Sequence, residues 1–426
     1  AFQFLYTYAD IQRVVIVCPA SVRPAWFDPE WGELAKHLWL NFPARIIEYH
    51  ARIRDWYHGG ATKQRPGLEI LITNYDFIRN PDRRVKLKQF VTTKDALLVL
   101  DESSAVKNHK ALQTRACLEL RKYCKRVVLL NGTPIANNPL DMYAQGLLMD
   151  PGILNCPTWT HFRAKYAIIG GFAVRGRAVQ ITGWQNLEDL QARFKPYVLR
   201  RLKTDCLDLP EKLPPVTLQA RLTPATWDIY KKMRDEMVAW LDQQTVSVAP
   251  QAIIKAMRLA QITSGFLGGL QDAEVDQDVL EAPDARPDWI PGDLLEDASA
   301  MKLMGNSREP VQAIGREKLD VFLGWLEDRF REDSNFKLLA WCRFRPELKR
   351  ALEELPKTFP KLTVGAIWGS QKRHERAAAL RMLDPRTAPK GPVVVMGTTR
   401  TGSMGLNLTA TSNVVYLSND YSLFYR

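Results

Sequence analysis

The sequence has few cysteines and no long apolar run, and these absences exclude several classes of protein. Six cysteines occur in 426 residues, and none lies in a CxxC pair or at a zinc-ligand spacing, which is typical of a reduced compartment. No apolar run reaches the ~18 residues that a membrane-spanning helix needs, and no signal segment opens the chain. We therefore expect a soluble intracellular protein, cytoplasmic in a prokaryotic or viral context and nuclear in a eukaryotic one.

Positive charge is in excess and unevenly distributed. The chain has 59 Lys and Arg against 47 Asp and Glu, a net charge of +12. Residues 51–126 contain 17 basic and 8 acidic side chains, whereas residues 271–300 contain 10 acidic and 1 basic. A basic domain beside an acidic segment suits a surface that binds a polyanion. A solvated basic face without a partner explains the charge alone equally well.

Short apolar runs alternate with amphipathic helical patterns in the first third and the last quarter of the chain. Continuous apolar runs predict strands that are covered on both faces of a parallel sheet. They fall at residues 14–17, 68–72, 96–100, 127–130, 337–341, 362–366, 393–396 and 413–417. Helical patterns at 111–123 and 317–331 lie between them. The sequence therefore predicts an α/β fold with two parallel-sheet domains.

The middle of the chain has a different character. Residues 222–266 carry long helical patterns, and residues 268–312 are rich in Asp, Pro and Gly with weak periodicity. We interpret this stretch as a helical, loop-rich insertion. The predicted division is a first lobe at 1–215, an insertion and acidic linker at 216–312, and a second lobe at 313–426.

A pair of carboxylates ends one of the predicted strands. Asp101 and Glu102 follow the apolar run 96–100, at the carboxyl end of a strand, where α/β sheets place their ligands. One carboxylate of such a pair can hold Mg²⁺ while the other polarises an attacking water. A helix N-cap with an acid in the first turn is the structural alternative for the same two residues.

Four other predicted strands also end in small polar residues. Gly132 permits a tight exit from the strand 127–130, and Thr133 can present a hydroxyl near Asp101. The three remaining exits carry Pro19 and Ser21, Asn74 and Tyr75, and the loop from Thr398 and Thr399 to Asn407. Side chains and backbone N–H groups at such exits can hydrogen-bond to the phosphates of a nucleic acid. Each exit taken alone is also a plain strand–turn–helix connection.

The order of these segments resembles the motif series of superfamily 2 helicase-like ATPases, most closely the SWI/SNF-type DNA-dependent ATPases. The matching segments, in chain order, are 14–21 with Trp26 (motif Ia), TNY at 73–75 (motif Ib), DESSAVKN at 101–108 (motif II), NGTPIANN at 131–138 (motif III), YVLRRLK at 197–203, LPEK at 209–212, AQITSGF at 260–266, 338–344 (motif IV) and GSMGLNL at 402–408 (motif V). The resemblance covers nearly the whole chain.

The resemblance implies two RecA-like lobes, ATP and Mg²⁺ as cofactors, and translocation on double-stranded DNA. Asp101 would hold Mg²⁺ and Glu102 would activate water. The nucleotide would be bound with the help of Gly402, Gly405 and Asn407. The DNA contacts would be Pro19, Ser21, Asn74, Tyr75, Thr133, Thr398 and Thr399. Coupling between the lobes would use Gly132, Thr133, Asn137, Arg200 and Arg201.

Three departures from the family pattern affect the expected activity. No G-x-x-x-x-G-K-[ST] phosphate loop is present in residues 1–426, and the sequence stops about where the family's arginine-finger segment would follow motif V. We interpret both gaps as truncated ends, so that each lobe is incomplete. Motif II also ends in Ser-Ser rather than Ala-His, which would alter the coupling between ATP and DNA. We expect residues 1–426 alone not to hydrolyse ATP at a useful rate, because the finger alone is worth roughly 10³–10⁵ in rate.

Other functions remain open on the sequence alone. One is an RNA-directed superfamily 2 helicase, which ATPase stimulation by RNA rather than duplex DNA would reveal. Another is a DNA-binding paralogue that has lost ATP turnover. A third is a motor subunit of a restriction or phage-defence system, although no nuclease or methyltransferase motif is visible.

Overall fold

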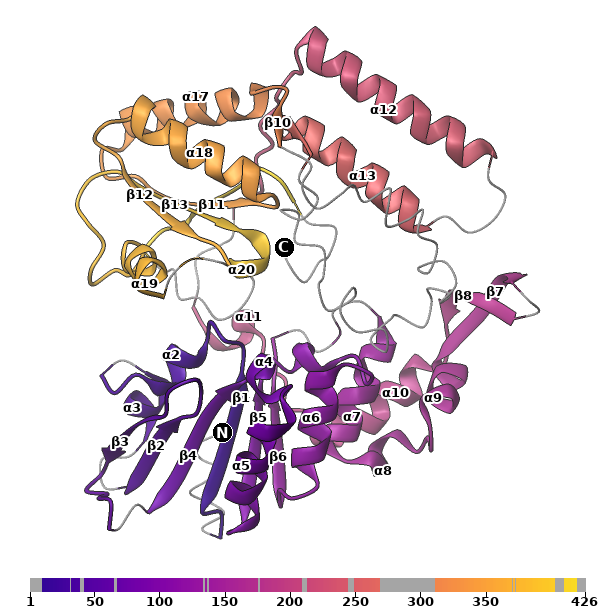
Figure 1. The fold of residues 1–426 in the computed structure, drawn as a ribbon, viewed down its shortest axis with the longest axis vertical. Helices are drawn as coiled ribbons and strands as arrows, with labels where there is room; N and C mark the ends of the chain where they lie inside the picture. The colour runs from indigo at the N-terminus through magenta and orange to yellow at the C-terminus, as the bar shows by residue number, and fades with distance from the viewer. Residues whose placement is uncertain are drawn as a thin grey trace. The chain divides into compact units, whose positions relative to one another are not determined.

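The computed structural model describes residues 10–30, 32–38, 42–64, 67–132, 135, 138–174, 177–208, 213–243, 249–268, 311–369, 371, 373–402 and 410–419. They fall into two compact units, one that ends at Arg201 and one that begins at Leu202 (Figure 1). Within these ranges, the search for membrane-spanning helices finds none of sufficient length and apolarity.

The first unit is built around a sheet whose described strands follow the order β3-β2-β4-β1-β5-β6. All neighbours pair in parallel except β3, which lies antiparallel to β2 at the edge. The strand bounds are β1 Arg13–Cys18, β2 Ala44–Glu48, β3 Arg54–His58, β4 Leu68–Asn74, β5 Ala96–Asp101 and β6 Arg126–Leu130. Because the strands are parallel, their carboxyl ends share one edge of the sheet.

The central strands β4, β1 and β5 are buried on both faces of the sheet, which explains why they are continuously apolar. Val15 and Leu98 point into one core layer, and Ile16 and Leu97 point into the other. Helices α5 (Pro81–Thr92) and α6 (Leu112–Arg121) supply part of the first layer and lie along the sheet in Figure 1. The second layer includes Trp26 from the short helix α2 (Arg23–Phe27).

The rest of the first unit packs around a separate aromatic core, which includes Phe162 and Tyr166. An antiparallel hairpin, β7 (Ala167–Val174) with β8 (Arg177–Trp184), extends from it. The remaining elements are α3 Glu33–His37, α4 Tyr75–Ile78, η1 Ser103–Val106, η2 Pro139–Asp141, α7 Met142–Met149, α8 Pro151–Leu154, α9 Trp159–Tyr166, α10 Leu187–Phe194 and η3 Lys195–Tyr197.

The second unit contains a smaller sheet, whose described strands are all parallel in the order β12-β13-β11-β14. Their bounds are β11 Lys337–Cys342, β12 Thr363–Ile367, β13 Val393–Thr398 and β14 Asn413–Tyr416. Helices α17 (Glu317–Glu332) and α18 (Arg345–Thr358) contribute Leu326 and Leu348 to its core. The other elements are α11 Lys203–Cys206, α12 Pro224–Gln243, α13 Ala249–Thr263, β9 Phe266–Leu267, β10 Gln312–Ala313, α19 Arg373–Arg381 and α20 Thr399–Gly402.

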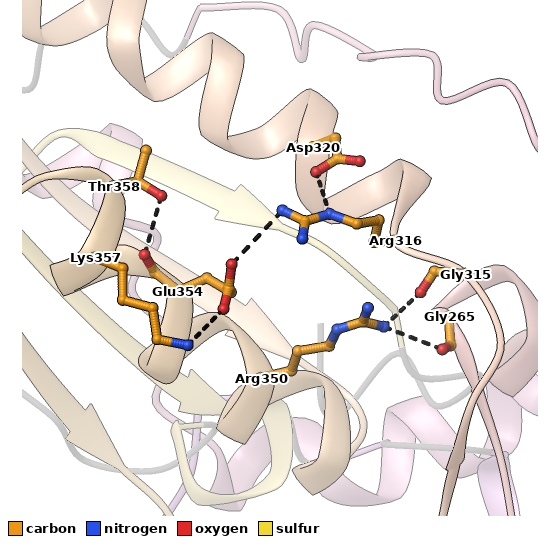
Figure 2. Close-up of polar contacts among 8 residues, drawn as sticks. All are labelled: Gly265, Gly315, Arg316, Asp320, Arg350, Glu354, Lys357 and Thr358. Carbon is orange, nitrogen blue, oxygen red and sulfur yellow. Dashed lines mark hydrogen bonds and ion pairs between the residues drawn. The ribbon is translucent and has the colours of Figure 1, made fainter.

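Polar contacts join the turn after α13 to the start of α17 and to α18 (Figure 2). The Arg350 guanidinium donates to the carbonyl oxygens of Gly265, at 3.2 Å, and of Gly315. Arg316 contacts Asp320 at 2.7 Å and Glu354 at 3.6 Å. These contacts attach the helical segment of the chain to the second sheet.

The predicted fold class is confirmed, since both units contain parallel sheets covered by helices. Each of the eight predicted strands is present, and α12 and α13 occupy the region that the sequence predicts as helical. The edge strand β3, its neighbour β2 and the hairpin β7–β8 were not predicted. Helices α12 and α13 belong to the same compact unit as the second sheet. The division of the chain into two lobes and a separate insertion stays a prediction. Most of the predicted acidic linker lies outside the described residues.

Candidate functional site

The register of the first sheet brings three of the predicted strand exits to one level. Cys18 at the end of β1 lies opposite Asn74 at the end of β4. On the other side of β1, Val17 lies opposite Leu100, so that Asp101 follows at the level of Cys18. The exits after β1, β4 and β5 are therefore neighbours on one edge of the sheet.

Asp101 is the last residue of β5, and both of its carboxylate oxygens accept a hydrogen bond. The indole Nε1 of Trp26 donates to Oδ2 at 2.7 Å, and the backbone N–H of Glu102 donates to Oδ1 at 3.1 Å. Burial raises the pKa of Asp101, and the two hydrogen bonds oppose that rise. The carboxylate is thus fixed in direction while it remains half-buried.

Glu102 has a backbone conformation that is rare for a residue with a side chain. Its φ of 51° and ψ of 55° lie in the left-handed region, which costs a non-glycine residue about 1–3 kcal/mol. Burial raises the pKa of Glu102, and the negative charge of Asp101 raises it further. Across the described residues, neither carboxylate has an ion-pair partner.

A hydrogen-bonded layer lies beneath the two carboxylates. The hydroxyl of Tyr75 donates to the backbone carbonyl of Asp101 at 2.7 Å. Ser103 donates to the Gln145 side chain at 2.9 Å and accepts from the Asn131 amide at 3.3 Å. These bonds join the ends of β5 and β6 to helix α7, so that the acidic turn has a rigid support.

The carboxylate pair fits a divalent cation bound together with a nucleotide. Two half-buried acids with raised pKa values and no cationic neighbour among the described residues favour binding of a positive ion. In the ranges described above, no group of three His, Cys, Asp or Glu side chains is placed to hold a metal. Mg²⁺ commonly binds through one or two carboxylates and completes its coordination with substrate phosphates and water. Asp101 is the residue that would hold it.

The predicted DNA-contacting residues of the first unit lie at this edge of the sheet, and they differ in how far they are exposed to solvent. Pro19 and Ser21 are half-buried, and the Pro19 carbonyl accepts from the backbone N–H of Val22 at 2.9 Å. Asn74 is 3% exposed, and its Oδ1 accepts no hydrogen bond from the part of the chain that the structure describes. Tyr75 is 5% exposed, and its observed contact is with Asp101. DNA binding by these residues stays a prediction.

The corresponding exit in the second unit follows β13. Thr398 is 1% exposed and its hydroxyl lies 2.8 Å from that of Thr401. Thr399 is 4% exposed, and its hydroxyl has no partner in the structure. Gly402 ends helix α20. Four other predicted site residues lie outside the described residues: Thr133, Asn137, Gly405 and Asn407.

Gly132 has no left-handed backbone angle, and a Cβ atom added to it would meet none of the described residues within 4 Å. The described residues therefore supply no requirement for glycine here, and its role in the strand exit stays a prediction. Arg200 and Arg201 are exposed, and Arg201 donates to the Arg200 carbonyl at 3.0 Å. Coupling between the lobes by these three residues stays a prediction.

Sequence reasoning missed the residues that hold the site in place. Trp26 was noted only as part of a motif, although its indole contacts the carboxylate of Asp101. Ser103, Asn131 and Gln145 were not expected to contact one another. A polar residue directly after a buried strand was the available signal for Asn131, whereas Gln145 lies within a helix and carried no such signal.

Comparison with known proteins identifies the family. Residues 3–264 match the model of the SNF2-related domain. The chain belongs to this family. It is 24% identical over 426 residues to the TATA-binding protein-associated factor mot1 of Schizosaccharomyces pombe, a match that covers 96% of the chain and 20% of the relative. It is 30% identical over 282 residues to a Caenorhabditis elegans homologue of the SWI/SNF-related matrix-associated actin-dependent regulator of chromatin subfamily A-like protein 1, covering 64% of the chain and 36% of that protein.

A structural comparison finds the SWI2/SNF2 ATPase core of Sulfolobus solfataricus in complex with double-stranded DNA. The match has a TM-score of 0.38 and 19% sequence identity, and it covers 98% of this chain and 74% of the other. The chain spans about a fifth of the length of the fission yeast relative. SNF2-related membership supports a helicase-like ATPase of the SWI/SNF type and the use of ATP with Mg²⁺.

Proposed function

We propose that the protein containing this chain is an ATP-driven motor that moves along double-stranded DNA inside the cell and remodels what is bound there. The observation that carries the proposal is the carboxylate pair Asp101 and Glu102. It lies without a cationic partner among the described residues, at the carboxyl edge of a parallel sheet. Membership of the SNF2-related family makes ATP the matching ligand.

The two carboxylates take different parts in hydrolysis. Asp101, held by Trp26, binds Mg²⁺, which when bound neutralises charge on the phosphates. Glu102 accepts a proton from the attacking water, and its raised pKa improves it as a base at neutral pH. The left-handed backbone at Glu102 makes a sharp turn directly after Asp101, and we assign the metal to Asp101 and the water to Glu102.

DNA binding is proposed to use the phosphate backbone. Backbone N–H groups and small side chains at the exits after β1, β4 and β13 suit phosphate oxygens, and the basic region 51–126 adds attraction. Affinity should then fall with salt by about 0.9 in log K per log unit of salt for each phosphate neutralised. It should change little between unrelated duplex sequences.

The decisive experiment measures ATP hydrolysis by the full-length protein with different polymers. We expect duplex DNA to stimulate hydrolysis strongly, and RNA and the no-polymer control to give little. Stimulation by RNA alone would replace the proposal with an RNA-directed helicase. No hydrolysis with any polymer, together with retained DNA binding, would identify a DNA-binding paralogue without turnover.

A second experiment tests the strand exits. The double variant Asn74→Ala with Thr399→Ala should weaken duplex binding at both of two salt concentrations, because it removes two polar groups from the proposed phosphate contacts. Substitution of the exposed Thr92, which hydrogen-bonds within α5 and lies away from these exits, provides the matched control. Unchanged affinity in the double variant, or strong preference for one DNA sequence, would contradict the proposal that these strand exits bind the phosphates of DNA.

A further inference from the structure

The indole of Trp26 is the one side-chain hydrogen-bond donor to Asp101 in the described part of the chain. Trp26 and Asp101 are 75 positions apart in sequence, and Nε1 lies 2.7 Å from Oδ2. The remaining donor to this carboxylate is the backbone N–H of Glu102, at 3.1 Å from Oδ1. A carboxylate offers about four acceptor positions, so these two bonds leave room for a metal ion.

The packing of Trp26 makes it a rigid donor. It is 8% exposed and belongs to the core layer on one face of the first sheet, together with Val22 and Phe27. Helix α2 has a proline in its first turn, which fixes the backbone on which the ring is carried. An indole that is packed in this way cannot turn to follow the carboxylate, so the carboxylate aligns with the indole.

An indole N–H also suits a partner to a metal ligand. It donates only, so it cannot itself bind the metal. It carries no charge, so it leaves the negative charge of the carboxylate available to a cation. Groups that hydrogen-bond to a metal ligand orient that ligand, and their loss typically lowers metal affinity by about 10–100-fold.

We propose that Trp26 is a positioning residue, which directs the Asp101 carboxylate toward the metal ion of a bound metal–nucleotide complex. This inference rests on the proposed function, because it requires a metal–nucleotide complex at Asp101. It adds a residue of α2 to a site whose other parts come from the ends of β5 and β6.

The test measures the affinity of Mn²⁺ for the full-length protein in the presence of a non-hydrolysable ATP analogue, by electron paramagnetic resonance. Trp26→Phe keeps an aromatic ring and removes the N–H, and we expect it to weaken Mn²⁺ binding about 10-fold. Asp101→Asn should weaken binding further, and Trp26→Phe should add little in the Asp101→Asn background. Trp26→Met provides a second variant without a donor if the phenylalanine variant folds poorly.

Trp56 offers a matched control. Its Nε1 donates to the backbone carbonyl of Phe27 at the same distance of 2.7 Å, and its ring packs against the same core layer. Trp56→Phe therefore removes an equivalent hydrogen bond without touching Asp101, and we expect it to leave Mn²⁺ affinity unchanged. An equal loss in Trp56→Phe would mean that core packing, and not the orientation of Asp101, sets the affinity.

The outcomes separate this inference from the function on which it rests. If Asp101→Asn weakens Mn²⁺ binding but Trp26→Phe does not, the positioning role is wrong and the proposed function stands. An equal effect of Trp26→Phe with and without Asp101 would also overturn the positioning role. If Asp101→Asn leaves Mn²⁺ affinity unchanged, the proposed metal site fails and the positioning role fails with it.

Discussion

Buried carboxylates occur in both units of the molecule, and their surroundings differ. In the first unit, the acids Asp101 and Glu102 have no ion-pair partner within the described ranges. In the second unit, the carboxylate of Glu347 lies 3.7 Å from the ammonium of Lys318 and accepts from the hydroxyl of Ser418. Burial raises the pKa of all three acids.

The difference separates a site that can bind a ligand from a structural ion pair. Around Glu347 the chain supplies its own cation, and Lys318 also donates to Ser264 at 3.3 Å, so the charges are matched within the fold. Around Asp101 no described residue supplies a cation, and we propose that a bound metal ion neutralises the charge. Raised pKa values occur in both regions and do not distinguish them. The two regions differ in that Glu347 has a cationic partner, whereas Asp101 and Glu102 have none among the described residues.

The largest effect should come from Glu102→Gln. The amide cannot take a proton from water, so we expect DNA-stimulated ATP turnover of the full-length protein to fall by about 10²–10⁴-fold. Nucleotide and duplex binding, measured by equilibrium titration, should remain. Glu347→Gln is the matched control, because it makes the same chemical change at the structural pair, and its turnover should stay near normal. Near-normal turnover in Glu102→Gln would show that the general base lies elsewhere.

The next largest effect should be on stability, from Lys318→Met. This change leaves Glu347 buried without its cation, and breaking such a pair costs about 3 kcal/mol or more. Urea unfolding of the full chain measures the loss. Lys318→Met combined with Glu347→Leu should recover most of the lost stability, since it removes both charges. A double variant as unstable as the single one would mean that the pair is not what stabilises this region.

Asp101→Asn should act in the opposite direction to Lys318→Met. The change removes a half-buried negative charge that lacks a cation and keeps an oxygen that accepts from Trp26. At neutral pH we expect the free energy of unfolding to rise by about 1 kcal/mol, in line with other strained or uncompensated functional sites. Thermal unfolding in the absence of nucleotide and metal measures the gain. A destabilised Asp101→Asn variant would show that the carboxylate has a structural role like that of Glu347.

Burial on both faces of a sheet leaves a direct record in the sequence, and it explains the prediction of β1, β4, β5, β11 and β13. All eight continuous apolar runs became strands, from β1 to β14. Strand β3 was not predicted because it is an edge strand with the mixed sequence RDWYH. Its neighbour β2 was not predicted either. The sequence also placed Asp101 and Glu102 correctly at the end of β5, since a carboxylate directly after a buried strand is a local signal.

Contacts between distant segments could not be predicted in the same way. The bond from Trp26 to Asp101 depends on the angle at which α2 returns over the sheet, which no local pattern records. Glu347 and Lys318 are polar residues on amphipathic helices, where such residues usually face water. The burial of Glu347 and its contact with Lys318 follow from the packing of α17 against α18 and from Ser418 after β14.

The smallest effect should come from Gly132→Ala, at the open edge of the first sheet. A Cβ atom there meets none of the described residues within 4 Å and the backbone is not left-handed, so the free energy of unfolding should change by less than about 0.5 kcal/mol. Gly397→Ala in β13 is the contrast, because its Cβ would lie 2.5 Å from the Trp341 ring and 2.9 Å from the Ile367 carbonyl oxygen. Overpacking of that kind costs about 1–3 kcal/mol. Urea unfolding of both variants compares them directly. If Gly132→Ala proved as costly as Gly397→Ala, the strand exit would need glycine after all, and the edge beside Asp101 would be as closely packed as the second sheet.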